Sequence, residues 1–252
     1  MIFAIKKKTV LKVATLVVVI SVLCALVFSS SVAPGFAGNK KLPIYSVETQ
    51  DNKVAITFDA SWGADKTSQI MDIMEQHGYK ATFFLVGFWV DNYPEKVKEI
   101  HERGHLIGNH STNHLHMNSL NETRIHEEIS RTGEKIEELV GYTPMFFRAP
   151  FGEYNDRLVN YCEKNNVKII QWDVDTLDWK GLSGSEITKR VLTKSVSGSV
   201  ILCHNNSEHI VSALPLMLMG LKNKGLTPVR LDELVYESDY RINQAGKQVK
   251  IA

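Results

Sequence analysis

The chain has 252 residues, of which 44% are hydrophobic and 23% charged, and its formal net charge is +1. These values are typical of a globular protein and exclude a disordered or collagen-like chain. The near-neutral balance provides no broad basic surface for a nucleic acid, so we expect no nucleic-acid partner.

The N-terminal segment differs from the rest of the chain in its hydropathy. Four lysines between positions 6 and 12 precede Val13–Val32, a run without a charged residue. A helix of that length can cross the roughly 30 Å hydrocarbon core of a bilayer, and the lysines favour a cytoplasmic N-terminus with an exported remainder. Gly35-Phe36-Ala37 offers a cleavage site after Ala37. Residues 1–37 are therefore predicted to be a signal peptide or a retained membrane anchor, and the sequence leaves both open.

Cysteine usage agrees with export but does not prove it. Cys24 lies in the apolar run, which leaves Cys162 and Cys203 in the exported part. Two cysteines are too few for a disulfide framework, although one bridge is compatible with an oxidising compartment. Buried free thiols are favoured, because an unpaired cysteine behaves as a small hydrophobic residue.

Strand and helix patterns alternate along most of the remaining chain. The expected strands are, in chain order, Val54–Phe58, Ala81–Val86, His105–Asn109, Met145–Phe147, Val167–Trp172, Ser199–Cys203 and Thr227–Leu231. The helical patterns between them are Thr67–His77, Pro94–Arg103, Glu122–Val140, Asp156–Asn165, Glu186–Ser195 and Val211–Lys224. Such alternation predicts parallel strands joined by helical crossovers.

The number of repeats indicates the architecture. About seven strand–helix repeats in one domain favour a distorted or incomplete (β/α) barrel over an open doubly wound sheet. We expect a lead-in segment at 38–53, with Pro43–Thr49 as a candidate strand, the barrel at 54–234 and a peripheral C-terminal tail at 235–252.

Unusual polar residues follow the expected strands. They are Asp59 after the first strand, His110 after the third, Arg148 after the fourth, Asp173 and Asp175 after the fifth, and His204 after the sixth. In a parallel α/β barrel the residues at the C-terminal ends of the strands converge on one face. The sequence therefore predicts a single site formed by these groups.

His110 and His114 are four residues apart. On a helical turn this spacing puts both imidazoles on one side, which suits two ligands of a tetrahedral metal. A histidine pair with this spacing more often lies on the surface or in the core without binding a ligand. The preceding Gly108-Asn109 indicates a turn that leaves a strand, which favours the metal interpretation.

Asp59 and Arg148 each have two interpretations. The aspartate ends an apolar run, and it is either a helix N-cap or a general base beside a metal-bound water. The arginine either pairs with that carboxylate through a bidentate fork or lies on the surface at a Pro-Gly turn.

Five segments together resemble the ordered motifs of the NodB-homology polysaccharide deacetylases (carbohydrate esterase family four). They are Thr57-Phe58-Asp59, His110-Ser111-Thr112-Asn113-His114, Arg148-Ala149-Pro150-Phe151-Gly152, Asp175-Thr176-Leu177-Asp178-Trp179 and Leu202-Cys203-His204. The resemblance extends over roughly residues 54–234, and Ser61-Trp62-Gly63 is most similar to the PdaB-type sporulation deacetylases. It implies a NodB-homology fold and hydrolysis of N-acetyl groups on peptidoglycan amino sugars, outside the membrane, in the cell wall or spore envelope.

The resemblance also implies roles, position by position. His110 and His114 would bind a divalent metal, commonly zinc, while Asp59 would be the general base and Arg148 would orient it. His204 would protonate the departing amine. The further residues implied are Asp175 or Asp178, which would tune that histidine, Leu202 and Trp179, which would line the acetyl pocket, and Phe151, whose backbone N–H would contact the oxyanion.

One position departs from the family pattern. A second aspartate, the third metal ligand, normally follows the base, whereas this chain has Ala60. Two imidazoles without a carboxylate make a poorer site for a divalent cation. The alternative function is therefore a catalytically weak or inactive homologue that binds wall glycan.

Overall fold

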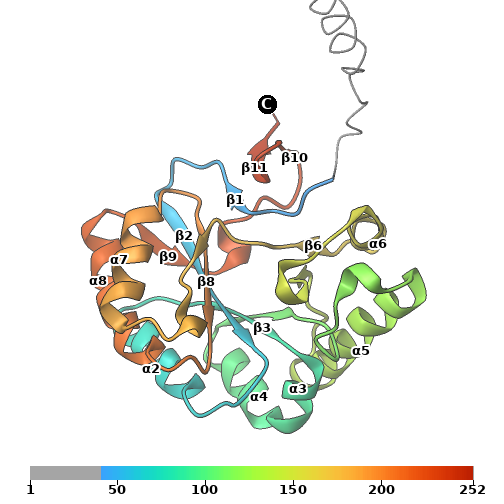
Figure 1. Ribbon diagram of the computed structural model, residues 1–252, viewed down its shortest axis with the longest axis horizontal. Helices are drawn as coiled ribbons and strands as arrows, with labels where there is room; N and C mark the ends of the chain where they lie inside the picture. The colour runs from blue at the N-terminus through green and yellow to red at the C-terminus, as the bar shows by residue number, and fades with distance from the viewer. Residues whose placement is uncertain (1–40, 252) are drawn as a thin grey trace, which may run out of the picture. The chain divides into compact units, whose positions relative to one another are not determined.

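A curved sheet of parallel strands lies at the centre of residues 41–251, the part of the chain that this computed structural model describes (Figure 1). Its strands follow one another in the order β6 (Lys168–Ile169), β5 (Phe146–Phe147), β4 (Leu106–Asn109), β3 (Thr82–Leu85), β2 (Lys53–Ala60), β8 (Val200–His204) and β7 (Val174–Asp175). An additional strand, β9 (Thr227–Val229), pairs with the beginning of β2. The predicted α/β fold with an incomplete barrel is confirmed.

The barrel is open between its two edge strands. Within the described residues no ladder joins β6 to β7; the chain passes from one to the other through residues 170–173. Ile44, from the lead-in segment, forms a parallel bridge with Ile170 at this opening. The sequence predicts one strand at Val167–Trp172, but the structure has only Lys168–Ile169 as a strand in that range. The chain then crosses to the other edge of the sheet, where β7 begins at Val174.

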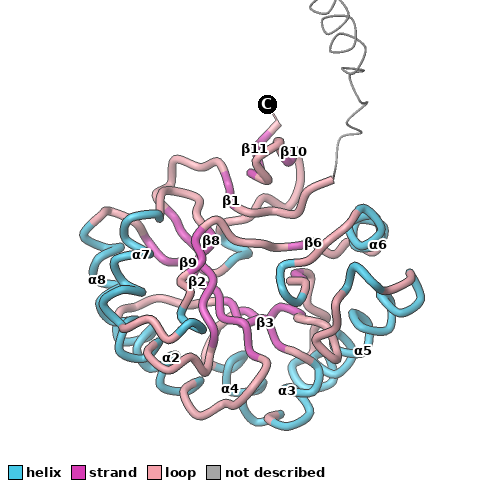
Figure 2. The backbone as a smooth tube through the Cα atoms, in the orientation of Figure 1, coloured by secondary structure: helices cyan, strands magenta, loops and turns pink. Residues whose placement is uncertain are grey.

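Helices cover the outer face of the sheet (Figures 1 and 2). They are α2 (Thr67–Gln76), α3 (Gly87–Asn92), α4 (Pro94–Glu102), α5 (Glu122–Val140), α6 (Asp156–Lys164), α7 (Gly184–Lys194) and α8 (Ile210–Asn223). Short 3₁₀ turns lie between them at η1 (Met117–Ser119), η2 (Pro150–Gly152), η3 (Asp178–Lys180) and η4 (Leu231–Glu233). The predicted helices are confirmed to within two residues at each end, whereas α3, with six residues, is too short to show a helical period in the sequence.

Helix α5 illustrates how the sequence determines these elements. Ile125, Ile129 and Ile136 are buried along one stripe of the helix, as their spacing predicts. The Asn121 side chain caps the first turn by accepting a hydrogen bond from the Arg124 amide, and Gly141 ends the helix in the left-handed conformation.

Strand β2 divides its side chains between two environments. Val54, Ile56, Phe58 and Ala60 belong to the main core, together with buried residues of α2 and α8. Because successive side chains in a strand point to opposite faces, Thr57 and Asp59 are directed to the inner side of the sheet.

The tail is more ordered than predicted. Strands β10 (Tyr240–Ile242) and β11 (Lys247–Lys250) form a hairpin, and β11 pairs in parallel with β1 (Ser46–Val47). The expected peripheral extension is thus a small sheet that joins the lead-in segment to the C-terminal end of the domain.

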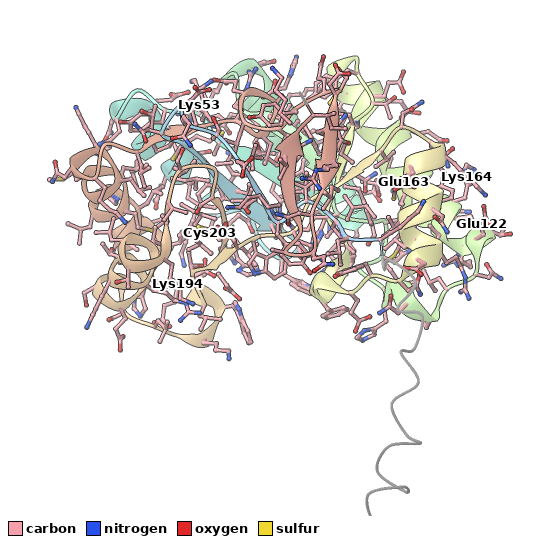
Figure 3. The ribbon with its side chains drawn as sticks, turned by 90° about the horizontal axis from the view of Figure 1, so that it is seen from above. Lys53, Glu122, Glu163, Lys164, Lys194 and Cys203 are labelled. Carbon is pink, nitrogen blue, oxygen red and sulfur yellow. The ribbon has the colours of Figure 1, made fainter. Side chains whose placement is uncertain are left out.

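Cys162 and Cys203 are both buried and free, and burial raises the pKa of each thiol. Figure 3 shows Cys203 inside the fold, while Glu163 and Lys164 project from α6. The apolar run Val13–Val32 and the cleavage site after Ala37 lie outside the described residues, and among the residues that are described no helix is long and apolar enough to span a membrane.

Candidate active site

A cavity of about 690 Å³ lies beside the C-terminal ends of β2, β4 and β8. Eight residues predicted from the sequence line it, namely Asp59, His110, His114, Phe151, Asp175, Trp179, Leu202 and His204. The other lining residues, which the sequence reasoning did not assign, are Ser61, Trp62, Gly152, Trp172, Asn205, Asn206 and Ser207. The structure therefore brings the motifs of five separate segments to one hollow.

Arg148 lies behind the cavity and holds Asp59. The guanidinium is completely buried, and its Nη1 donates to Asp59 Oδ1 at 2.7 Å and to Thr57 Oγ1 at 2.9 Å. Its Nη2 donates instead to the Gln171 carbonyl oxygen, and the guanidinium carbon stands 4.2 Å from the centroid of the Phe84 ring. The predicted bidentate fork is therefore wrong: one nitrogen contacts the carboxylate, and the second is held by the chain at the barrel opening.

This arrangement keeps Asp59 ionised. Burial alone would raise the pKa of its carboxyl group, but the charge of Arg148, followed by His110 and His204, lowers the pKa below the ordinary value. Asp59 is thus a carboxylate that can accept a proton. The helix N-cap interpretation is wrong, because Asp59 lies inside β2 and the residue that precedes the next helix, α2, is Lys66.

The two motif histidines meet at the cavity wall. His110 Nδ1 donates to the Arg148 carbonyl oxygen at 2.7 Å, which leaves Nε2 as the acceptor nitrogen, 3.5 Å from Asp59 Oδ2. Burial lowers the pKa of His110, and burial together with His110 lowers the pKa of His114 to about 4. Both imidazoles are therefore neutral at neutral pH, and their ring centroids are 5.0 Å apart.

A loop, and not the helical turn expected from their spacing, brings these rings together. Ser111 and His114 both have positive φ, and the Ser111 hydroxyl accepts a hydrogen bond from the His114 amide. The predicted proximity of His110 and His114 is therefore confirmed, but the predicted helical turn is not.

Glu128 of α5 fixes that loop, and the sequence reasoning missed it. Its carboxylate is buried and accepts hydrogen bonds from the backbone amides of Thr112 at 3.1 Å and Asn113 at 2.8 Å, and from the Asn113 side chain at 2.7 Å. A signal was present, because Glu128 is adjacent to Ile129 and three residues from Ile125, and so interrupts the apolar stripe with a charge.

His204 occupies another part of the cavity wall and pairs with Asp178. Asp178 Oδ1 accepts from His204 Nδ1 at 2.7 Å, and its Oδ2 accepts from the His204 amide at 2.8 Å and the Ser207 hydroxyl at 2.9 Å. Burial would lower the pKa of His204, but Asp178 outweighs it and, with Asp59 and Asp175, raises the pKa above the ordinary value. Asp178 is thus the direct partner of the histidine.

Asp175 and Asp173 have different positions. Asp175 lines the cavity, and its carboxylate accepts a hydrogen bond from the Leu177 amide, so it acts on His204 only through its charge. Asp173 accepts from the Ser199 hydroxyl and the Val200 amide and does not line the cavity. Of the two, only Asp175 belongs to the predicted site.

Backbone strain gathers at this cavity. Among the described residues, seven non-glycine residues have positive φ, and three of them are Asn or Asp, which tolerate that region. The other four are Ser111, His114, Phe151 and Leu177, all within the motif loops. A non-glycine residue keeps this strained conformation only where the surrounding structure enforces it. The motif loops are therefore held in one conformation, which fixes the positions of their side chains at the cavity.

The donor set is incomplete for the expected metal site. Neutral imidazole nitrogens suit zinc, and the backbone contact at His110 Nδ1 is typical of a metal-binding histidine. However, Ala60 is completely buried in the core and does not line the cavity. Between residues 41 and 251 no group of three His, Cys, Asp or Glu side chains has the geometry to hold a metal ion. The residues present therefore fit two ligands and not the three that the resemblance implies.

Comparisons with known proteins identify the family of this chain. The profile of the Polysaccharide deacetylase family matches residues 46–170. A peptidoglycan-N-acetylglucosamine deacetylase of Bacillus cereus is 40% identical over 193 residues, covering 75% of this chain and 70% of the relative. The crystal structure of the Bc1960 peptidoglycan N-acetylglucosamine deacetylase superposes with a TM-score of 0.74 at 38% identity, covering 76% of this chain and 91% of that one.

Other structures similar to this chain belong to a pseudoenzyme of the same family. BA3943 of Bacillus anthracis, a family pseudoenzyme, has a TM-score of 0.75 at 29% identity, covering 82% of this chain and 72% of that one. A mutant of BA3943 with restored enzymatic activity has a TM-score of 0.74 at 32% identity, covering 77% and 71%. Both active enzymes and pseudoenzymes thus share this fold, and together with the family profile and the 40% identical relative they show that the chain belongs to the polysaccharide deacetylase family.

Proposed function

We propose that this protein hydrolyses N-acetyl groups on amino sugars of peptidoglycan. The observation that carries the proposal is that two oppositely paired groups line one cavity: Asp59 contacts Arg148 Nη1 at 2.7 Å, and His204 Nδ1 contacts Asp178 Oδ1 at 2.7 Å. These partners lower the pKa of Asp59 and raise the pKa of His204. Amide hydrolysis needs a base that activates water and an acid that protonates the amine. The names of the relatives at 40% and 38% identity support peptidoglycan as the substrate.

The chain's own residues account for the proton movements. Asp59 accepts a proton from a water molecule, whose oxygen attacks the acetyl carbonyl carbon to give a tetrahedral oxyanion. His204 donates its proton to the amide nitrogen, the C–N bond breaks, and acetic acid and the free amine leave. The acid then ionises to acetate, and Asp59 returns its proton to water. Leu202 and Trp179 line the cavity where the acetyl methyl group would lie, and we assign the Phe151 backbone N–H to the oxyanion.

The family generally depends on a metal ion, and we propose zinc at His110 and His114. A bound zinc ion would supply Lewis-acid activation of water, as metal ions do in hydrolases. The missing ligand at Ala60 makes that site weak, so the proton relay described above does not include the metal.

A non-catalytic glycan-binding protein is the second candidate. It is favoured by Ala60 and by the similarity to the pseudoenzyme BA3943. Against it, Asp59, Arg148 and His204 are retained with their partners in place.

The test is acetate release from peptidoglycan fragments by the full-length chain, with and without added zinc, compared with Asp59→Asn. Release that depends on Asp59 supports the hydrolase. Binding of the fragments without release, at saturating zinc, supports the non-catalytic candidate.

We also propose export, from the N-terminal run, and a role in sporulation, from the Ser61-Trp62-Gly63 likeness to PdaB-type proteins.

A further inference from the structure

Gln171 is a buried residue at the barrel opening that does not line the cavity and yet contacts three groups around it. It is 2% exposed, and it lies between β6 and β7, where the chain crosses from one edge of the sheet to the other. The next residue, Trp172, does line the cavity. A buried polar side chain in this place needs hydrogen-bond partners, and those partners belong to the site.

The backbone of Gln171 joins the lead-in segment to the arginine that holds the proposed base. Its N–H donates to the Ile44 carbonyl oxygen at 2.7 Å, and its carbonyl oxygen accepts from Arg148 Nη2 at 3.2 Å. Arg148 in turn donates from Nη1 to Asp59 Oδ1 at 2.7 Å. Because these contacts of Gln171 use backbone atoms, a substitution leaves their donors and acceptors in place, and the side chain can be tested by itself.

The side chain of Gln171 contacts the turn that carries Phe151. Its Nε2 donates to the Gly152 carbonyl oxygen at 2.9 Å, and the two groups pack so closely that a Cβ atom on Gly152 would stand 3.4 Å from Gln171 Oε1 and 2.9 Å from the Trp172 ring. Phe151 has φ +59°, a conformation that a residue of this size keeps only where its surroundings enforce it. The Gln171 side chain supplies one such constraint.

The backbone hydrogen bonds of the turn are local and do not fix it to the rest of the fold. The Gly152 amide donates to the Ala149 carbonyl oxygen at 3.1 Å, and the Glu153 amide donates to the Pro150 carbonyl oxygen at 3.2 Å. The Phe151 side chain is 57% exposed, so its packing constrains the turn less than that of a buried ring would. The Gln171 bond instead ties the turn to a segment 19 residues away.

We propose that Gln171 is a positioning residue whose side chain, through Gly152, holds the Phe151 N–H in the orientation that the oxyanion needs. The inference rests on the proposed function, which assigns that N–H to the oxyanion. A donor aimed at the oxyanion contributes in the transition state and little in the ground state. A displacement of about 1 Å in such a group can cost roughly 10²-fold in rate. Loss of the Gln171 bond should therefore lower kcat and leave KM nearly unchanged.

Kinetics and amide hydrogen exchange of the full-length chain test this role. Gln171→Met keeps the length of the side chain and removes the donor. We expect kcat for acetate release from peptidoglycan fragments to fall about 10- to 100-fold with KM changed less than about twofold, and the Gly152 and Glu153 amides to exchange faster. Gln248→Met is the matched control, because Gln248 is completely buried in β11, does not line the cavity and donates from Nε2 to the Tyr236 carbonyl oxygen at the same 2.9 Å. Its kcat should equal that of the wild type even if its thermal stability falls.

A second variant tests the donor and not the space that the side chain fills. Gln171→Glu keeps the shape of the side chain, but its carboxyl group can donate to the Gly152 carbonyl oxygen only while it is protonated. The ratio of its kcat to that of the wild type at the same pH should therefore rise as the pH falls. A ratio that is the same at every pH would show that the hydrogen bond has no part in turnover, and it would overturn the inference.

The outcomes separate this inference from the proposed function. A kcat in Gln171→Met no lower than that in Gln248→Met, or a rise in KM alone, removes the positioning role and leaves the hydrolase standing. If the wild-type protein releases no acetate, the hydrolase is removed, and amide exchange decides the rest. Faster exchange of the Gly152 and Glu153 amides in Gln171→Met alone then supports Gln171 as the residue that holds the turn, whereas unchanged exchange overturns that as well.

Discussion

Asp178 holds His204 through both of its carboxylate oxygens, one on the ring nitrogen Nδ1 at 2.7 Å and one on the backbone amide at 2.8 Å. The first contact stabilises the imidazolium, and the second fixes the strand end from which the ring projects. Because Nδ1 is engaged, Nε2 is the nitrogen left to donate a proton into the cavity. The Asp178 carboxylate therefore determines both the charge of His204 and the orientation of its ring.

Replacing Asp178 by Asn should move the alkaline limb of the pH–rate profile to lower pH. The pKa of His204 is raised in the folded protein, so its charged form is retained to higher pH than in a free imidazole. In stability terms, the contribution of the pair is fully present below the unfolded pKa of about 6.5 and is lost as pH rises through the folded pKa. Asp173→Asn, which alters a carboxylate that does not touch His204, should leave the limb in place. An unchanged limb in Asp178→Asn would remove this pair from the mechanism.

Asp59→Asn should lower turnover by at least roughly 10²-fold, the usual effect of losing a general base. The amide oxygen can still accept from Arg148, but the charge that neutralises this buried guanidinium is lost, so unfolding should cost about 2 kcal/mol less. Acetate release and chemical denaturation measure the two effects. The control is Asp91→Asn, an exposed carboxylate on α3 that pairs with Lys135. Turnover equal to wild type in Asp59→Asn would exclude this residue as the base.

Much of the site was predictable because each polar group directly follows an apolar run in the sequence. Parallel strands bring the ends of these runs to one face, so Asp59, His110 and His204 line the cavity and Arg148 lies behind it against Asp59. The choice between Asp175 and Asp178 was not predictable, since it depends on the left-handed turn at Leu177, which carries no sequence signature.

Contacts between residues distant in the sequence were also not predictable, even where a charge in an apolar stripe marked the residue, as at Glu128. Glu128 lies among other charged residues of α5, and its carboxylate acquires a role only when the loop at Thr112–Asn113 packs against that helix. In the same way, a polar tail gives no indication that β11 will pair with β1, some two hundred residues earlier. Pairing of this kind is decided by tertiary packing and not by local preference.

Glu128→Gln should loosen the loop that carries the two motif histidines. The amide group can accept at one end only, so at least one of the donors from Thr112 and Asn113 faces an NH₂ group in a buried site. Such a mismatch costs about 1–3 kcal/mol, and turnover should fall while binding of glycan fragments changes little. Glu127→Gln is the matched control, because its side chain is partly exposed and pairs only with Arg124 among the described residues. Equal stability of the two variants in chemical denaturation would show that the Glu128 contacts do not hold the loop.

The N-terminal segment gives a prediction of its own. If cleavage follows Ala37, the extracellular protein begins at Gly38, and if the apolar run is retained, the membrane fraction contains a chain that begins at Met1. N-terminal sequencing of both fractions from an expressing cell distinguishes the two. A full-length chain confined to the cytosol would contradict export altogether.

Ala60→Asp tests the missing ligand. Ala60 is packed in the core next to Asp59, and its carbonyl oxygen accepts a hydrogen bond from the Val86 amide at 3.1 Å. A carboxylate there should therefore lower the free energy of unfolding by about 2 kcal/mol in the absence of metal. If its oxygen reaches His110 and His114, zinc affinity should rise roughly 10- to 100-fold and zinc should restore the lost stability. Calorimetric zinc titration, thermal unfolding with and without zinc, and acetate release at matched occupancy measure these effects.

Ala60→Asn separates the carboxylate from its size, because it has nearly the same shape and no charge. The metal interpretation requires that zinc binds and stabilises Ala60→Asp while leaving Ala60→Asn unchanged. If both variants are destabilised alike and bind zinc no better than wild type, then residue 60 stays in the core, as its burial indicates, and a metal site centred on the two histidines has to be abandoned. Tighter zinc binding by Ala60→Asp with a gain in acetate release would identify the natural chain as a weakened metalloenzyme. Tighter binding with no release from either protein would favour the glycan-binding function, because the base, the acid and the metal would then all be present without turnover.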